Sequence, residues 1–205
     1  MSNANSLVIL DFETTGLSPN QGDRAIEIGA IRLENGIVTE QFQQLMNPGC
    51  RVSNFIENYT GITNSMLEDA APCAEVMDRF VDFIGSDNLI AHNASFDQRF
   101  LDAELTHITK RYTGSFSCSV LLSRRIFQDA PSYNLGNLSR YLGIRTDGGF
   151  HRALFDAEVT GKLWCLLIDE IQQQTQLEVV PFTLIQKIVK TPKKLVPALL
   201  ASYSN

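Results

Sequence analysis

The fold is predicted from residues 7–46, which read LVILDFETTGLSPNQGDRAIEIGAIRLENGIVTEQFQQLM. The first apolar run, 7–13, is typical of a buried strand and ends in two acids. Residues 25–33 alternate partly at period two, and residues 37–46 are again strand-like. An Asn-Gly dipeptide separates these two runs, and this dipeptide between strands strongly favours a hairpin. We therefore expect an antiparallel meander of three strands.

The rest of the chain alternates between helix-like and strand-like segments. Short strands are expected at 88–91 and 115–119. Apolar residues at helical spacing predict helices over 74–84, 96–108, 120–127, 135–142 and 154–171. A meander followed by alternating helices and strands predicts an α/β fold, a single domain around one mixed sheet.

Composition excludes several protein classes. The 205 residues are 44% apolar and 20% charged, which excludes wholesale disorder and fits one domain with at most a short appendage. The apolar runs are too short to cross a bilayer, so we expect no association with a membrane. The four cysteines are scattered without C-x-x-C spacing, and this fits a reducing compartment, the cytoplasm.

Charge is distributed unevenly along the chain. The net charge is −6, from 17 basic and 23 acidic residues, which is unfavourable for a protein that coats nucleic acid generally. It does not exclude an enzyme that holds only a strand end through bound cations. Residues 181–205 carry four lysines and no acid, so we expect a boundary near residue 175 between a core domain, 1–174, and a C-terminal extension, 175–205.

The extension is also rich in apolar residues, too rich for a free tail, and we expect it to be helical. It could pack on the core, pair with a second copy of the chain or dock onto a protein partner. Its lysines could instead contact a nucleic-acid backbone.

Three clusters of side chains carry chemistry. Asp11 and Glu13 stand two apart at a strand end, so both carboxylates should project from one face while Phe12 faces the other. Asp97 falls in the first turn of a predicted helix that follows the fourth strand. Two strand ends thus deliver acids to the edge of the sheet where open sheets bind ligands.

His151 and Asp156 form the third cluster. On one helix they would point about 140° apart, so they can share a site only if His151 lies in the loop before the helix. The glycine pair at 148 and 149 favours such a movable loop. A histidine there, facing carboxylates, can serve as a general base.

Together these clusters resemble the DEDDh-type 3′→5′ exonucleases, a family that includes the proofreading subunit of bacterial replicative DNA polymerase. The three family motifs are matched by DFETTGL at 11–17, HNASFD at 92–97 and HRALFD at 151–156. Further landmarks match at EIGA (27–30), TGIT (60–63) and LGNL (135–138), and the resemblance covers residues 7–172. It implies an RNase H-like fold with a five-stranded mixed sheet flanked by helices.

The resemblance also implies roles for individual residues. The catalytic set is His151 with four acids, and these acids hold the metal: Asp11, Glu13, Asp97 and Asp156. Two Mg²⁺ or Mn²⁺ ions would balance the four negative charges, and hard oxygen ligands favour these ions over zinc. His151 would take the proton of the attacking water.

Substrate contacts are implied after the first motif and near the second. The residues expected to hold the terminal nucleotide are Thr14, Thr15, Leu17, Ile62, His92 and Phe96, with His92 facing a phosphate. Because apolar contacts with bases tolerate any base, we expect little sequence specificity. The partner is then a nucleic-acid 3′ end, with single-stranded or frayed DNA preferred and RNA possible.

Three alternatives stay open at this point. An RNA-trimming or oligoribonucleotide exonuclease would share the fold, because recognition of the 2′-OH is a local detail. A non-catalytic, polymerase-associated or scaffold subunit would use the extension to bind its partner. An acidic hydrolase of small phosphodiesters would need a closed pocket.

Overall fold

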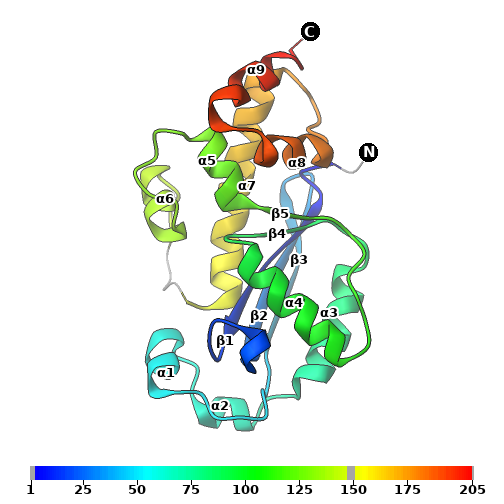
Figure 1. The fold of residues 1–205 in the computed structure, drawn as a ribbon, viewed down its shortest axis with the longest axis vertical. Coiled ribbons are helices and arrows are strands. Elements are labelled where there is room, and N and C mark those ends of the chain that lie inside the picture. Colours follow the sequence, from blue (N-terminus) through cyan, green and yellow to red (C-terminus); the bar gives the residue numbers. More distant parts are fainter. Residues whose placement is uncertain (1–2, 147–150, 205) are drawn as a thin grey trace.

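The computed structural model describes residues 3–146 and 151–204, and its centre is one five-stranded mixed sheet (Figure 1). The strands are β1 (Leu7–Thr14), β2 (Ala25–Glu34), β3 (Ile37–Leu45), β4 (Leu89–Ala91) and β5 (Phe116–Cys118), in the order β3-β2-β1-β4-β5. β1 pairs antiparallel with β2 and parallel with β4. The mixed sheet and the opening meander are confirmed.

The hairpin between β2 and β3 follows from its two turn residues. Asn35 and Gly36 have φ angles of 53° and 80°, the left-handed region that Asn and Gly tolerate best. Glu34 therefore pairs directly with Ile37. This short turn fixes the register of the meander.

Helices cover both faces of the sheet (Figure 1). They are α1 (Asn54–Thr60), α2 (Asn64–Glu68), α3 (Cys73–Ile84), α4 (Ser95–His107), α5 (Ser119–Ile126), α6 (Leu135–Tyr141), α7 (Ala153–Thr175), α8 (Phe182–Lys190) and α9 (Val196–Ala201), with 3-10 turns η1 (Pro19–Gln21) and η2 (Lys193–Leu195). Side chains of α5 to α9 share one hydrophobic cluster with one face of β1 and β2. Side chains of α3 and α4 share a second cluster with the opposite face.

The segment after α7 packs on the same core as the rest of the chain. Its buried apolar side chains are Phe182, Leu184, Ile185, Ile188, Val196 and Leu200. Ala4, near the N-terminus, is hydrogen-bonded to this segment and to α7. Its backbone N donates to Val180 O at 2.9 Å, and its backbone O accepts from Trp164 Nε1 at 2.8 Å. Each such buried side chain stabilises the fold by about 1.5–3 kcal/mol, so this segment is an integral part of the folded chain.

Across the described residues, no helix is both long and apolar enough to cross a membrane. The longest, α7, spans 23 residues and carries both acidic and basic side chains along its length.

Candidate active site

The carboxyl end of β1 carries the first two acids. Leu7 and Ile9 belong to the cluster under α7, whereas Phe12 belongs to the cluster under α3 and α4. Asp11 and Glu13 alternate with Phe12 and therefore face α7, as the strand period predicts. Glu13 is only 8% exposed, so its carboxylate is largely removed from water.

A close approach of α7 to β2 brings the third acid to this end of the sheet. Gly29 lies opposite Asp11 in the β1–β2 register. A Cβ atom built on Gly29 would stand 2.0 Å from Leu154 N and 2.2 Å from Ala153 C. The first turn of α7 can therefore rest on the sheet only because this position has no side chain.

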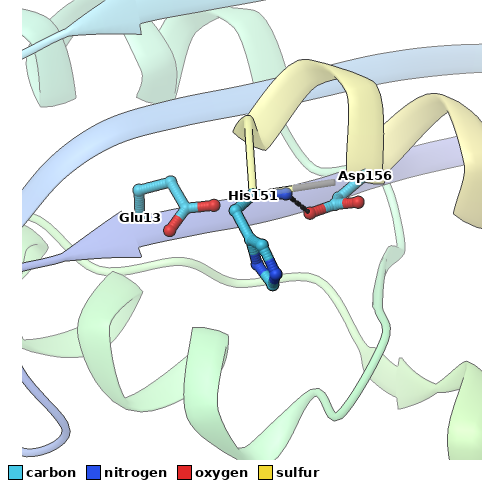
Figure 2. A group of neighbouring side chains, drawn as sticks. All are labelled: Glu13, His151 and Asp156. Atoms are coloured by element: carbon cyan, nitrogen blue, oxygen red, sulfur yellow. Dashed lines mark hydrogen bonds between the residues drawn. The ribbon is translucent and has the colours of Figure 1, made fainter. Parts of the chain in front are cut away.

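Asp156 lies in that first turn of α7, and His151 lies in the loop before it, as predicted. His151 has a φ of 74°, and its backbone N donates to Asp156 Oδ2 at 3.0 Å. Figure 2 shows His151 between Glu13 and Asp156, with this hydrogen bond drawn. The glycines at 148 and 149, which we expected to make the loop movable, lie outside the described residues.

Asp97 joins the group from the neighbouring strand. β4 ends at Ala91, whereas the neighbouring strand β1 continues to Thr14. The backbone N of Phe12, in the part of β1 that extends past β4, donates to Asp97 Oδ1 at 3.2 Å. Asn93 turns the chain from β4 into α4 with a φ of 79°, a conformation that Asn tolerates. This turn places Asp97 in the first turn of α4 beside β1, where it is 2% exposed.

The four acids repel one another in a poorly hydrated site. Burial, and then the charges of Asp97 and Asp156, raise the pKa of Asp11 well above its ordinary value. Burial, followed by Asp156, raises the pKa of Glu13 to about 8, and burial raises that of Asp97 to about 7. Burial also raises the pKa of Asp156, against the hydrogen bond from His151. Such a group ionises fully only when cations neutralise it.

The geometry fits divalent metal ions. Ligand atoms of Glu13, His151 and Asp156 lie within 4.8 Å of one another. Asp156 Oδ1 is buried, and nothing within the described residues hydrogen-bonds to it. A buried oxygen that lacks a partner is costly, and a cation at this point would remove the cost. His151 adds a nitrogen that the four predicted metal ligands did not include.

Sequence reasoning missed a further acid, Glu27, that anchors the site. Glu27 is fully buried and lies opposite Glu13 in the register. It accepts from Arg152 Nη2 at 2.8 Å, Ala153 N at 3.1 Å and Gln43 Nε2 at 2.9 Å. Glu27 thus holds the start of α7, and with it the loop of His151. The sequence did offer one indication of this role, because Glu27 falls on the strand that pairs with the strand of Glu13.

The acids open onto a cleft of about 710 Å³, which has an apolar rim. Leu17, Phe55 and Tyr59 line it and are 77%, 71% and 50% exposed. The Phe55 and Tyr59 rings stack at 5.7 Å between centroids, and the Tyr59 ring lies 3.9 Å from that of His151. Exposed aromatic rings beside a charged cleft are suited to stacking on bases. Neither Phe55 nor Tyr59 was predicted, since α1 carries no motif that marks them.

The predicted substrate residues divide into two groups. Thr14, Thr15, Leu17 and Phe96 line the cleft. The two threonine hydroxyls are used within the loop itself, because Thr14 Oγ1 donates to Gly16 O at 2.6 Å and Thr15 Oγ1 accepts from Arg24 N at 3.0 Å. These bonds shape the loop that presents Leu17.

The other two predicted contact residues, Ile62 and His92, are both held by neighbouring parts of the protein. Ile62 is fully buried in a separate cluster with Ile26, Val52 and Leu67, because it follows α1 and faces inward. His92 does line the cleft, but its ring nitrogens are 2.9 Å from Ser119 Oγ and 2.9 Å from Tyr133 O. Burial lowers the pKa of His92 to about 4, so its ring is neutral at neutral pH.

Comparison with known families gives one match over most of the chain. A family described as Exonuclease (RNase_T) matches residues 8–164. These residues contain all five strands, the four acids and His151. The match ends within α7, before α8 and α9.

Three curated relatives are similar in sequence. The chain is 37% identical over 178 residues to the 3′-5′ exonuclease DinG of Bacillus subtilis, covering 83% of this chain and 18% of that protein. It is 34% identical over 166 residues to a DNA polymerase III PolC-type of Caldanaerobacter subterraneus, covering 81% and 12%. It is 32% identical over 171 residues to the DNA polymerase III subunit epsilon of Aquifex aeolicus, covering 81% and 82%. The chain therefore spans less than a fifth of the first two relatives and most of the third.

Solved structures agree on the fold. Exonuclease X in complex with 5′ overhanging duplex DNA superposes with a TM-score of 0.69 at 25% identity, covering 89% of this chain and 99% of that one. The nuclease domain of 3′hExo, a DEDDh family member bound to rAMP, superposes with a TM-score of 0.68 at 21% identity, covering 86% and 96%. The expected RNase H-like arrangement is confirmed.

Proposed function

This chain belongs to the exonuclease family, and from that membership we propose that it removes nucleotides from the 3′ end of single-stranded or frayed DNA with two divalent metal ions. The products are nucleoside 5′-monophosphates. The observation that carries the proposal is that Asp11, Glu13, Asp97 and Asp156 line one cleft. Within it Asp156 Oδ1 is buried and lacks a hydrogen-bond partner among the described residues.

The four carboxylates would hold the ions, with His151 beside them. Two Mg²⁺ or Mn²⁺ ions in such a site stabilise the charge that develops on the attacking and leaving oxygens of a phosphodiester. Hard carboxylate ligands without cysteine favour these two metals. The curated relatives and the likeness to Exonuclease X support nuclease chemistry at this site.

His151 acts as the general base. A ring nitrogen of His151 accepts the proton of the attacking water, the water oxygen bonds to phosphorus, and the bond from phosphorus to the 3′ oxygen breaks. The leaving 3′ oxygen takes a proton from solvent, so the new strand end carries a 3′-hydroxyl. Arg152 and Ala153 N, both bonded to Glu27, keep the His151 loop over the acids during this step.

The rim residues would hold the terminal bases. Leu17, Phe55 and Tyr59 offer apolar and aromatic surface that accepts any base and needs the strand end unpaired. RNA stays an alternative substrate, because a single contact to a 2′-OH separates the two sugars. The four unpaired cysteines fit work in a reducing compartment such as the cytoplasm.

A time course on single-stranded DNA and RNA, labelled at either end, tests the proposal with Mg²⁺, Mn²⁺ or chelator. We expect stepwise shortening from the 3′ end, faster on DNA, and none in chelator. The matched variants are Asp156→Asn, which should abolish activity, and Asp169→Asn, which alters an exposed acid on the same helix and should retain it. Equal activity in both variants would assign the cleavage to a contaminant.

A further inference from the structure

A group of cations on α5 and η2 gathers around the ring of Tyr133. We propose that Arg124, Arg125 and Lys193, called here the basic surface, bind phosphates of the substrate strand upstream of its 3′ end. This inference rests on the proposed function and names a second contact region for the same substrate. It also gives a role to η2, which lies outside the matched family region.

Two of these cations share one aromatic ring. Arg124 Cζ lies 5.6 Å from the centroid of the Tyr133 ring, and Lys193 Nζ lies 5.5 Å from it. Arg125 Nε donates to Thr191 O at 3.3 Å, and Gln128 Nε2 donates to Lys193 O at 3.1 Å. Residues nearly seventy positions apart in the chain are thus held side by side by contacts between α5 and the segment after α8.

Within the part of the chain that the structure describes, the basic surface takes part in no ion pair. One exposed acid, Asp129, lies close enough to affect the pKa of Tyr133. Three cations against one acid leave excess positive charge, although the whole chain carries −6. Cations gathered on an acidic protein favour a polyanionic ligand.

The position of the basic surface relative to the cleft indicates which anion it binds. His92 lines the cleft, and its ring contacts Tyr133 O and Ser119 Oγ, the latter at the first residue of α5. Tyr133 therefore connects the two regions, because its backbone oxygen lies against His92 while its ring lies against Arg124 and Lys193. A strand that leaves the cleft past Tyr133 would meet these cations with its phosphates.

A double variant, Arg124→Gln with Lys193→Gln, tests the inference. The matched control is Arg79→Gln with Lys110→Gln, which removes the same charge from the flank of α3 and α4. Binding of a single strand of about 15 nucleotides is measured by fluorescence anisotropy in chelator over a range of salt concentrations. Loss of two phosphate contacts should reduce the slope of log K against log salt by about 1.4. The control should keep the wild-type slope.

Hydrolysis provides a second measurement. For the long strand we expect KM to rise about fivefold with kcat unchanged, while kcat/KM for a dinucleotide stays at the wild-type value. An unchanged slope and KM, an equal loss in the control, or an equal loss on the dinucleotide would each overturn the inference. If the wild type cleaved nothing at all, the proposed function would fail, and the anisotropy data would still decide the inference.

Discussion

Substituting Gly29 by alanine tests how the site is assembled. Gly29 lies on β2 opposite Asp11, and its added Cβ would stand 2.0 Å from Leu154 N. Ordinary contact begins at 3.4 Å, so α7 and β2 must separate by about 1.4 Å at this point. The neighbour is helix backbone, which cannot rotate away as a side chain can.

The consequence for catalysis follows from the size of this shift. Asp156 and the His151 loop move with the start of α7, whereas Asp11 and Glu13 stay on β1. A misplacement of about 1 Å costs roughly 100-fold in rate, so kcat/KM should fall at least 100-fold. Overpacking costs about 1–3 kcal/mol, or roughly 2–12 °C in Tm for a chain of this length. The fold should survive, because α7 stays anchored through buried Trp164.

The assay compares Gly29→Ala with Gly161→Ala on a labelled single strand, with circular dichroism to confirm folding. Gly161 also lies on α7 against the sheet, but an added Cβ there meets side-chain ends and no backbone, with Ile31 Cδ1 at 2.5 Å and Ile9 Cδ1 at 3.7 Å. We expect Gly161→Ala to retain activity and to gain helix stability. Activity of Gly29→Ala within twofold of wild type would refute the idea that this close approach sets the geometry of the acids.

Three further predictions follow from the charges and the rim. Asp11→Asn removes repulsion among the clustered acids, so it should raise the Tm of the metal-free protein by roughly 2–4 °C. The same change should abolish cleavage. A lower Tm in calorimetry would contradict the first expectation. The raised pKa values of Glu13 and Asp97, about 8 and about 7, mean that the folded protein keeps protons that the unfolded chain releases near pH 4. Metal-free stability should therefore be greatest in mild acid and fall as pH rises through 7 to 8. Over the same range the Mg²⁺ concentration for half-maximal rate should fall, because fewer protons compete for the carboxylates; titrations at both ends of the range check both trends. Tyr59→Ala should raise KM for single strands about 5- to 150-fold, since stacking contributes about 1–3 kcal/mol per base, whereas Tyr59→Phe should keep the wild-type KM.

Local periodicity predicted the meander, the α/β class and where the acids stand, whereas the role of these acids in catalysis was implied by the family resemblance. Alternation along 7–13 places Asp11 and Glu13 on one face, and the spacing of His151 and Asp156 requires one in a loop and one on a helix. The Asn-Gly dipeptide at 35 and 36 sets the turn between β2 and β3. These features depend on backbone geometry over a few residues, so the sequence alone determined them.

Only the tertiary structure decided what surrounds the acids. Ile62 and Tyr59 lie three residues apart, yet one is fully buried and the other half-exposed on the rim. The contact of Gly29 with α7 joins segments more than 120 residues apart, as does the bond of Glu27 with Arg152. Burial and such long-range contacts depend on how helices pack on the sheet, and residue spacing along the chain carries no measure of that packing.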